Sequence, residues 1–107
     1  MKAYILYGSK RSQPEAKSML EHLLALQFEA RHSDYQGGEY FRAGSKDGEG
    51  FVLKQNVDPY DGEPVEACGS EFPTLFYVNA TFRATALKAV MDLAGNAFVL
   101  LREEVVS

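Results

Sequence analysis

The 107-residue chain contains a single cysteine, Cys68, and no long hydrophobic run. One cysteine cannot form an internal disulfide, and its isolation excludes a cysteine-rich metal site. The apolar run near the start, Ala3 to Tyr7, is five residues long. That is too short for the apolar region of a signal peptide or for a membrane span of ~20 residues. We therefore expect no targeting segment, no membrane association and a cytoplasmic location.

The sequence also lacks the common motifs of catalysis and cofactor binding. It contains no glycine-rich dinucleotide fingerprint and no phosphate loop. Asp58, Asp61 and Glu63 do not have the spacing of a calcium-binding EF-hand loop. His32 and Cys68 could form a nucleophilic pair, but no supporting motif accompanies them. We expect no catalytic residue, no metal site and no cofactor.

Basic residues are scarce in the middle of the chain. The formal net charge is −4, but residues 34–71 hold nine acidic and three basic side chains, a net charge of −6. An acidic segment repels phosphate backbones, so nucleic acid is not an expected ligand. It attracts a basic partner and speeds the encounter with it. A solvated acidic surface that serves solubility is the alternative interpretation.

The same region contains a strong hairpin signal. Residues 35–42 and 50–57 have the aromatic and β-branched content of strands, and Asp47-Gly48 lies between them. Asp-Gly in this position favours a type I′ turn, because both of its central residues need positive φ. Gly37-Gly38 inside the first arm predicts a bulge or a strand break.

Alternation along the hairpin predicts which side chains face the core. Phe51, Leu53 and Val57 share one face of the second arm, which we expect to be buried. If Phe41 joins this core, the opposite face is solvated and carries Tyr40, Arg42, Lys54 and Asn56.

The rest of the chain predicts two helices and three more strands. Residues 2–7 are apolar on both faces, which is typical of a strand inside a sheet. Ser12-Gln13-Pro14-Glu15 is a capping box that starts a helix ending at about Gln27. The remaining elements are expected to be a buried strand over 73–78, a helix over 82–94 and a final strand over 97–102. The helix is expected to have Asn79 or Thr81 as its N-cap, Leu93 on its inner face and Gly95-Asn96 as the signal that ends it.

This order of elements predicts one α+β domain over residues 1–107. We expect a single mostly antiparallel sheet with two helices on one face, similar to a ferredoxin-like fold with an additional hairpin strand. The second face of the sheet is then open to solvent or to a partner.

Three segments carry a resemblance to a known family: S-D-Y-Q-G-G-E-Y-F-R from Ser33, L-K-Q-N-V-D from Leu53 and P-T-L-F-Y-V-N from Pro73. They resemble segments of immunity proteins of contact-dependent growth inhibition and related polymorphic toxin systems. The resemblance implies a small cytoplasmic protein without catalytic activity that binds one cognate toxin domain, often a nuclease, and blocks it. The matching positions are Asp34, Tyr35, Gly37, Gly38, Tyr40 and Asn56.

The candidate partner-binding residues combine aromatic, arginine and acidic side chains. Tyrosine and arginine are enriched at the energetic centres of interfaces, although these aromatics could also fill the small core. The expected set is Asp34, Tyr35, Glu39, Tyr40, Arg42, Asn56, Asp58, Tyr60 and Asp61. We expect a monomer or a weak homodimer. Two alternatives use the open sheet face: a small-molecule-binding or enzymatic domain near Tyr40, Arg42 and Asn56, and a homo-oligomeric structural module.

Overall fold

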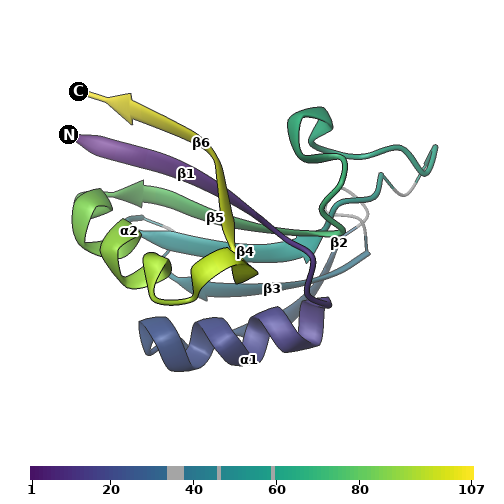
Figure 1. Cartoon of the computed structure of the whole chain (residues 1–107), viewed down its shortest axis with the longest axis horizontal. Helices are drawn as coiled ribbons and strands as arrows, with labels where there is room; N and C mark the ends of the chain where they lie inside the picture. Colours follow the sequence, from purple (N-terminus) through teal and green to yellow (C-terminus); the bar gives the residue numbers. More distant parts are fainter. Residues whose placement is uncertain (34–37, 46, 59) are drawn as a thin grey trace.

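Six strands form a single sheet in the order β2-β3-β4-β5-β1-β6, and every neighbouring pair is antiparallel (Figure 1). The computed structural model describes residues 1–33, 38–45, 47–58 and 60–107. The first strand, β1 (Lys2–Ser9), lies between β5 (Thr74–Thr81) and β6 (Val99–Val106). Its predicted position inside the sheet is therefore confirmed.

The other half of the sheet is a meander of three strands. β2 (Glu29–Ser33) pairs with β3 (Gly38–Gly44), β3 pairs with β4 (Gly50–Gln55), and β4 pairs with β5. The predicted hairpin is confirmed, since β3 and β4 are its two strands, and its second arm ends at Gln55 rather than Val57. β2 is not predicted by the sequence, because none of its side chains is buried and it has no apolar periodicity to reveal it.

Two helices cover the same face of the sheet, as predicted (Figure 1). α1 (Gln13–Leu24) begins after Ser12, whose hydroxyl oxygen accepts a hydrogen bond from the Glu15 N–H at 3.3 Å. It ends at Ala25, a residue with a φ of 54°, and so stops short of the predicted boundary. α2 spans Ala84–Asp92. The α+β fold with one antiparallel sheet and two helices on one face is confirmed.

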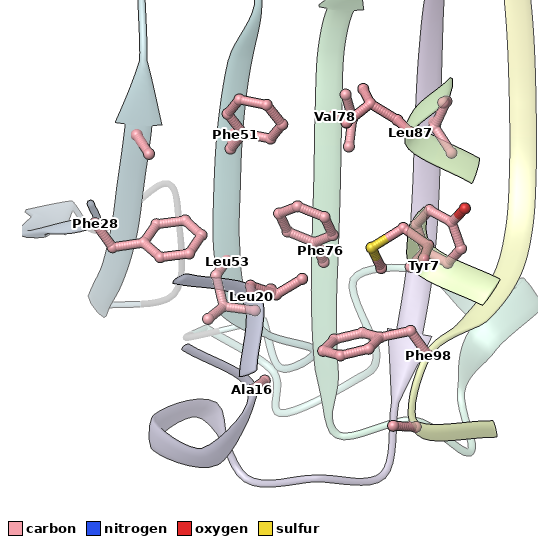
Figure 2. Close-up of a cluster of buried hydrophobic side chains, with 14 of the residues drawn as sticks. Tyr7, Ala16, Leu20, Phe28, Phe51, Leu53, Phe76, Val78, Leu87 and Phe98 are labelled. Atoms are coloured by element: carbon pink, nitrogen blue, oxygen red, sulfur yellow. The ribbon is translucent and has the colours of Figure 1, made fainter. Parts of the chain in front are cut away.

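Aromatic rings fill the core between the sheet and the helices (Figure 2). Phe76 on β5 is at its centre, where its ring lies 6.0–6.5 Å from the ring centroids of four other aromatic side chains. Those four are Tyr7, Phe28, Phe51 and Phe98. Residues of both helices close the core from the other side: Ala16, Leu20, Leu87 and Met91.

The ends of the second helix differ from the prediction. Asn79 and Thr81 belong to β5, and the residue at the N-cap of α2 is Arg83, whose side chain makes no capping hydrogen bond. Leu93 follows the helix and is exposed rather than buried. β5 therefore extends past the predicted end of its apolar run, because its last residue, Thr81, still pairs with Ala3 of β1.

The turn between β3 and β4 is not the predicted type I′ turn. Its positive φ of 85° belongs to Gly44, whereas Asp47 and Gly48 do not have positive φ. The turn is closed by the Ser45 N–H, which donates to the Glu49 carbonyl at 2.9 Å. Gly38 is the first residue of β3 and has a φ of 98°, while the other half of the predicted bulge, Gly37, lies outside the described residues.

Gly44 is the position in this turn where a side chain should be costly. Replacing Gly44 by alanine is expected to lower the free energy of unfolding by about 1–3 kcal/mol, since alanine is strained at this φ and its Cβ would meet the Glu49 carbonyl oxygen. Gly48→Ala is the matched control, because its Cβ would have no neighbour within 4 Å. Urea denaturation of both variants tests the prediction, and equal stability of the two would contradict it.

Candidate partner-binding surface

The sheet face away from the helices carries a continuous row of side chains from five strands. Register pairs Arg42 with Val52, Val52 with Tyr77, Tyr77 with Leu6, and Leu6 with Arg102. Opposed residues in an antiparallel sheet point to the same face. This row is the middle of the predicted open face.

One end of that face is covered by a long loop. Residues 57–73, here called the acidic loop, connect β4 to β5, and the described ones, 57–58 and 60–73, lie on the side opposite the helices (Figure 1). Their charged residues are Asp58, Asp61, Glu63, Glu66 and Glu71, without a single lysine or arginine. Phe72 fixes the end of the loop on the sheet, where a Cβ on Gly8 would lie 2.6 Å from its ring. The acidic loop thus has a net charge of −5 within 17 residues.

Asn56 holds the acidic loop in place. Its Nδ2 group donates to the carbonyls of Gly69 at 3.0 Å, Phe72 at 3.1 Å and Glu66 at 3.4 Å. Its Oδ1 accepts from the Glu66 N–H at 2.9 Å. The Asn56 backbone N–H also donates to the Pro73 carbonyl at 2.8 Å. One side chain therefore ties together three points of the loop.

The prediction that Lys54 and Asn56 lie on a solvated face is wrong. They point away from the helices, but they are only 7% and 5% exposed, because the acidic loop folds over them. Val57, expected in the core, is 44% exposed, since β4 ends at Gln55 and the alternation ends with it. Burial lowers the pKa of Lys54, against the opposing effect of the Glu66 and Asp58 carboxylates.

Glu66 joins the loop to the neighbouring strands. The Tyr77 hydroxyl donates to its Oε1 at 2.8 Å, and the Arg102 guanidinium donates to both carboxylate oxygens at 3.2 and 3.3 Å. Burial alone would raise the pKa of Glu66, but the hydrogen bonds from Tyr77 and Arg102 outweigh it and leave the pKa below its ordinary value. Burial and the Glu66 carboxylate raise the pKa of Tyr77.

This network predicts a pH-dependent contribution to stability. A carboxyl whose pKa is lowered by folding stabilises the protein above its unfolded-state pKa, and this contribution is lost as the pH falls through the folded-state pKa. Glu66→Gln is expected to lower the free energy of unfolding at neutral pH, with a difference from wild type that shrinks in acid. Chemical denaturation over a pH series measures this difference. The control is Glu63→Gln, and an equal pH profile for both variants would contradict the prediction.

The exposed part of the acidic loop is built from two aspartate turns. Asp58 Oδ1 accepts from the Tyr60 N–H at 2.8 Å, and Asp61 Oδ1 accepts from the Glu63 N–H at 2.9 Å. The Asp58 backbone N–H also donates to the Glu63 carbonyl at 2.8 Å. These bonds hold Tyr60 at the surface with 80% of its area exposed. Both aspartates thus have a structural role, because each closes its turn through one carboxylate oxygen.

At the other end of the open face lies a small hollow of about 270 Å³. Its floor includes Gly50, and Arg42, Tyr4 and Asn79 contribute polar side chains from three different strands. The Arg42 guanidinium reaches over the glycine, since a Cβ on Gly50 would lie 3.9 Å from Nη2. Arg42 makes no ion pair within the part of the chain that the structure describes.

The predicted partner-binding residues do not form one cluster. Asp58, Tyr60 and Asp61 lie together on the acidic loop, whereas Arg42 lies on the sheet beside the hollow and Tyr40 precedes it on the same face. Glu39 pairs with His32 and belongs to the opposite face, and Asn56 is buried. Asp34 and Tyr35 lie outside the described residues.

Sequence reasoning does not assign a partner-binding role to several residues of this surface: Tyr4, Glu63, Glu66, Glu71, Tyr77, Asn79 and Arg102. The loop glutamates could have been found, because no lysine or arginine lies between them and the predicted aspartates Asp58 and Asp61. The strand residues could not, because their proximity depends on strand order.

Among the described residues, no group of three or more His, Cys, Asp or Glu side chains could hold a metal ion. In the same residues, no helix combines the length and the apolar character needed to cross a membrane. No family model matches the chain, and no curated protein matches it.

Proposed function

We propose that the protein is a non-catalytic inhibitor, an immunity protein that binds a cognate toxin domain through its acidic loop. The observation that carries this proposal is the set of five carboxylates, without a basic residue, on a loop held by Asn56. A loop ordered before binding loses less conformational entropy when the complex forms. A nuclease is the expected toxin class, because nucleases present basic surfaces to phosphate backbones.

The loop also offers an anchor for such a complex. Tyr60 projects into solvent between Asp58 and Asp61, and large aromatic side chains supply much of the binding energy at interface centres. The surrounding carboxylates would meet lysine or arginine side chains and speed association. Glu66 is engaged by Arg102 and Tyr77 and would keep the loop in shape rather than contact the toxin.

Charge removal without loss of the turns tests the role of the loop. Changing Asp58 and Asp61 together to asparagine keeps the side-chain oxygens that accept from the Tyr60 and Glu63 N–H groups. We expect the association rate with the toxin to fall about three- to tenfold at low salt and to depend less on salt. Surface plasmon resonance at two salt concentrations measures both effects.

The matched control removes the same charge elsewhere. Asp47 and Asp92 are exposed aspartates outside the acidic loop, and their double change to asparagine should leave association close to wild type. If the two double variants behave alike, net charge and not the loop governs the encounter. Unchanged rates in the loop variant at both salt concentrations would contradict recognition by the loop.

The proposed function itself is tested with the product of the neighbouring upstream reading frame. Co-expression should yield a stable complex on purification, and the chain should restore growth to cells that carry the toxin domain. A neighbouring product that neither inhibits growth nor co-purifies would count against an immunity protein.

The hollow beside Arg42 favours a second candidate, a domain that binds a small carboxylate. Arginine binds carboxylates in a bidentate manner, and Tyr4 and Asn79 could add hydrogen bonds. The volume of about 270 Å³ lies just below the usual range of ~300–1,000 Å³ for ligand pockets. Calorimetric titration with small dicarboxylates, with Arg42→Gln as control, separates this candidate from the first.

A further inference from the structure

β6 is an edge strand of unusual character. It has eight residues, V-L-L-R-E-E-V-V, and among the described residues it pairs with β1 alone. Its exposed apolar residues are Val99, Leu100, Val105 and Val106. The opposite edge strand, β2, has five residues, E-A-R-H-S, and is mainly polar. Long apolar edges invite pairing with another strand, and proteins usually shorten them or cover them.

The residues of β6 are complementary to themselves in the antiparallel direction. Read from Leu100 to Val106 the strand is L-L-R-E-E-V-V. When two copies of this segment are aligned antiparallel about Glu103, each leucine of one copy is opposite a valine of the other. Arg102 is then opposite Glu104, and Glu103 is opposite Glu103 of the second copy. A strand of this kind can pair with a second copy of the same chain about a two-fold axis.

The structure places these charges on matching faces. Arg102 pairs with Leu6 and Glu104 with Tyr4, so both point to the face away from the helices. Glu103 points to the helix side, where the Lys88 Nζ donates to its carboxylate at 2.7 Å. The Glu103 carboxylate is therefore neutralised within each copy, and its position at the centre adds little repulsion.

Only one register brings opposite charges together. A shift of one copy by one residue would place side chains from opposite faces of the sheet across from each other. The alternative registers are therefore shifts by two residues. One of these puts Arg102 opposite Arg102, and the other puts Glu104 opposite Glu104, both of which destabilise strand pairing. The contact between Arg102 and Glu104 within one chain is long, at 3.6 Å, and exposed, which leaves Glu104 available to a second copy.

We propose that two copies of this chain pair through β6, antiparallel and centred on Glu103, so that the sheet continues across the dimer. Leu101 is an extra residue in β6 relative to β1. The regular pairing therefore spans Arg102 to Glu104, and the apolar residues on either side pack around it. This inference does not depend on the proposed function.

Charge reversal followed by mixing tests the register. Arg102→Glu and Glu104→Arg each place like charges opposite one another, so each variant alone should dimerise at least about tenfold more weakly than wild type. An equimolar mixture of the two restores opposite charges and should form a heterodimer. Sedimentation equilibrium over a concentration series measures all three samples. The control is Arg31→Glu on β2, which should dimerise like wild type.

A second measurement covers the case in which a charge variant folds poorly. In a Cys68→Ala background, Glu103→Cys should form a disulfide dimer with oxidised glutathione, because opposed residues in antiparallel strands lie within disulfide distance. Arg31→Cys in the same background should remain monomeric. A wild-type chain that sediments as a monomer at every concentration overturns the proposal. So does a mixture that fails to associate, or cross-linking that is equal at both positions.

Discussion

Replacing Asn56 by alanine is expected to lower the free energy of unfolding by about 2–4 kcal/mol and to release the acidic loop from the sheet. The side chain makes hydrogen bonds to Gly69, Phe72 and Glu66 in a buried position. Each bond contributes about 0.5–1.5 kcal/mol net, and the partners left unpaired add to the loss. Because the same bonds shape the loop, any binding of the proposed toxin partner through this loop should weaken as well.

Denaturation and amide exchange together separate these effects. The Glu66 N–H donates to Asn56 Oδ1 and should exchange faster in the variant, whereas amides of β1 and β5 should follow global stability only. The control is Gln55→Ala, which removes the exposed neighbouring side chain. If loop amides keep their protection in Asn56→Ala, the loop is held by other contacts.

Replacing Phe76 by alanine should have the largest effect on stability. Its ring is buried among those of four aromatic neighbours (Figure 2), and truncation of such a residue costs about 3–5 kcal/mol. A domain of this size has a total stability of only about 5–15 kcal/mol. We therefore expect a protein close to the limit of folding at ordinary temperature.

Thermal unfolding followed by circular dichroism measures the loss. The matched control is Phe82→Ala, because Phe82 is the same residue type in an exposed position, and its replacement should change stability by less than about 0.5 kcal/mol. Equal losses for the two variants would mean that the ring cluster is not the centre of the core.

The fold class can be predicted from the sequence because the main strands and helices have recognisable patterns of apolar residues. β1 and β5 are continuous apolar runs, and Ser12 marks the start of α1. β2 escapes prediction because it buries no side chain and becomes a strand only by pairing with β3. The β3–β4 turn is misread because the residue that needs positive φ is Gly44, outside the Asp-Gly pair.

The candidate surface is predictable only in part, for a related reason. Net charge identifies the acidic loop, since acidic residues in one loop share one surface whatever the fold. Alternation correctly places Asn56 on the face away from the helices, but it carries no information on a loop that returns to cover that face. The hollow between Tyr4, Arg42 and Asn79 joins β1, β3 and β5, and only tertiary structure brings these strands together.

The place of β1 in the sheet constrains the order in which a newly made chain can fold. β1 ends at Ser9, but its neighbours β5 and β6 begin at Thr74 and Val99. The strands of the meander, in contrast, pair with their sequence neighbours and close short loops, which is fast. During synthesis on the ribosome, β1 therefore waits as an apolar segment without partners, and it is the segment that a chaperone would hold until β5 emerges.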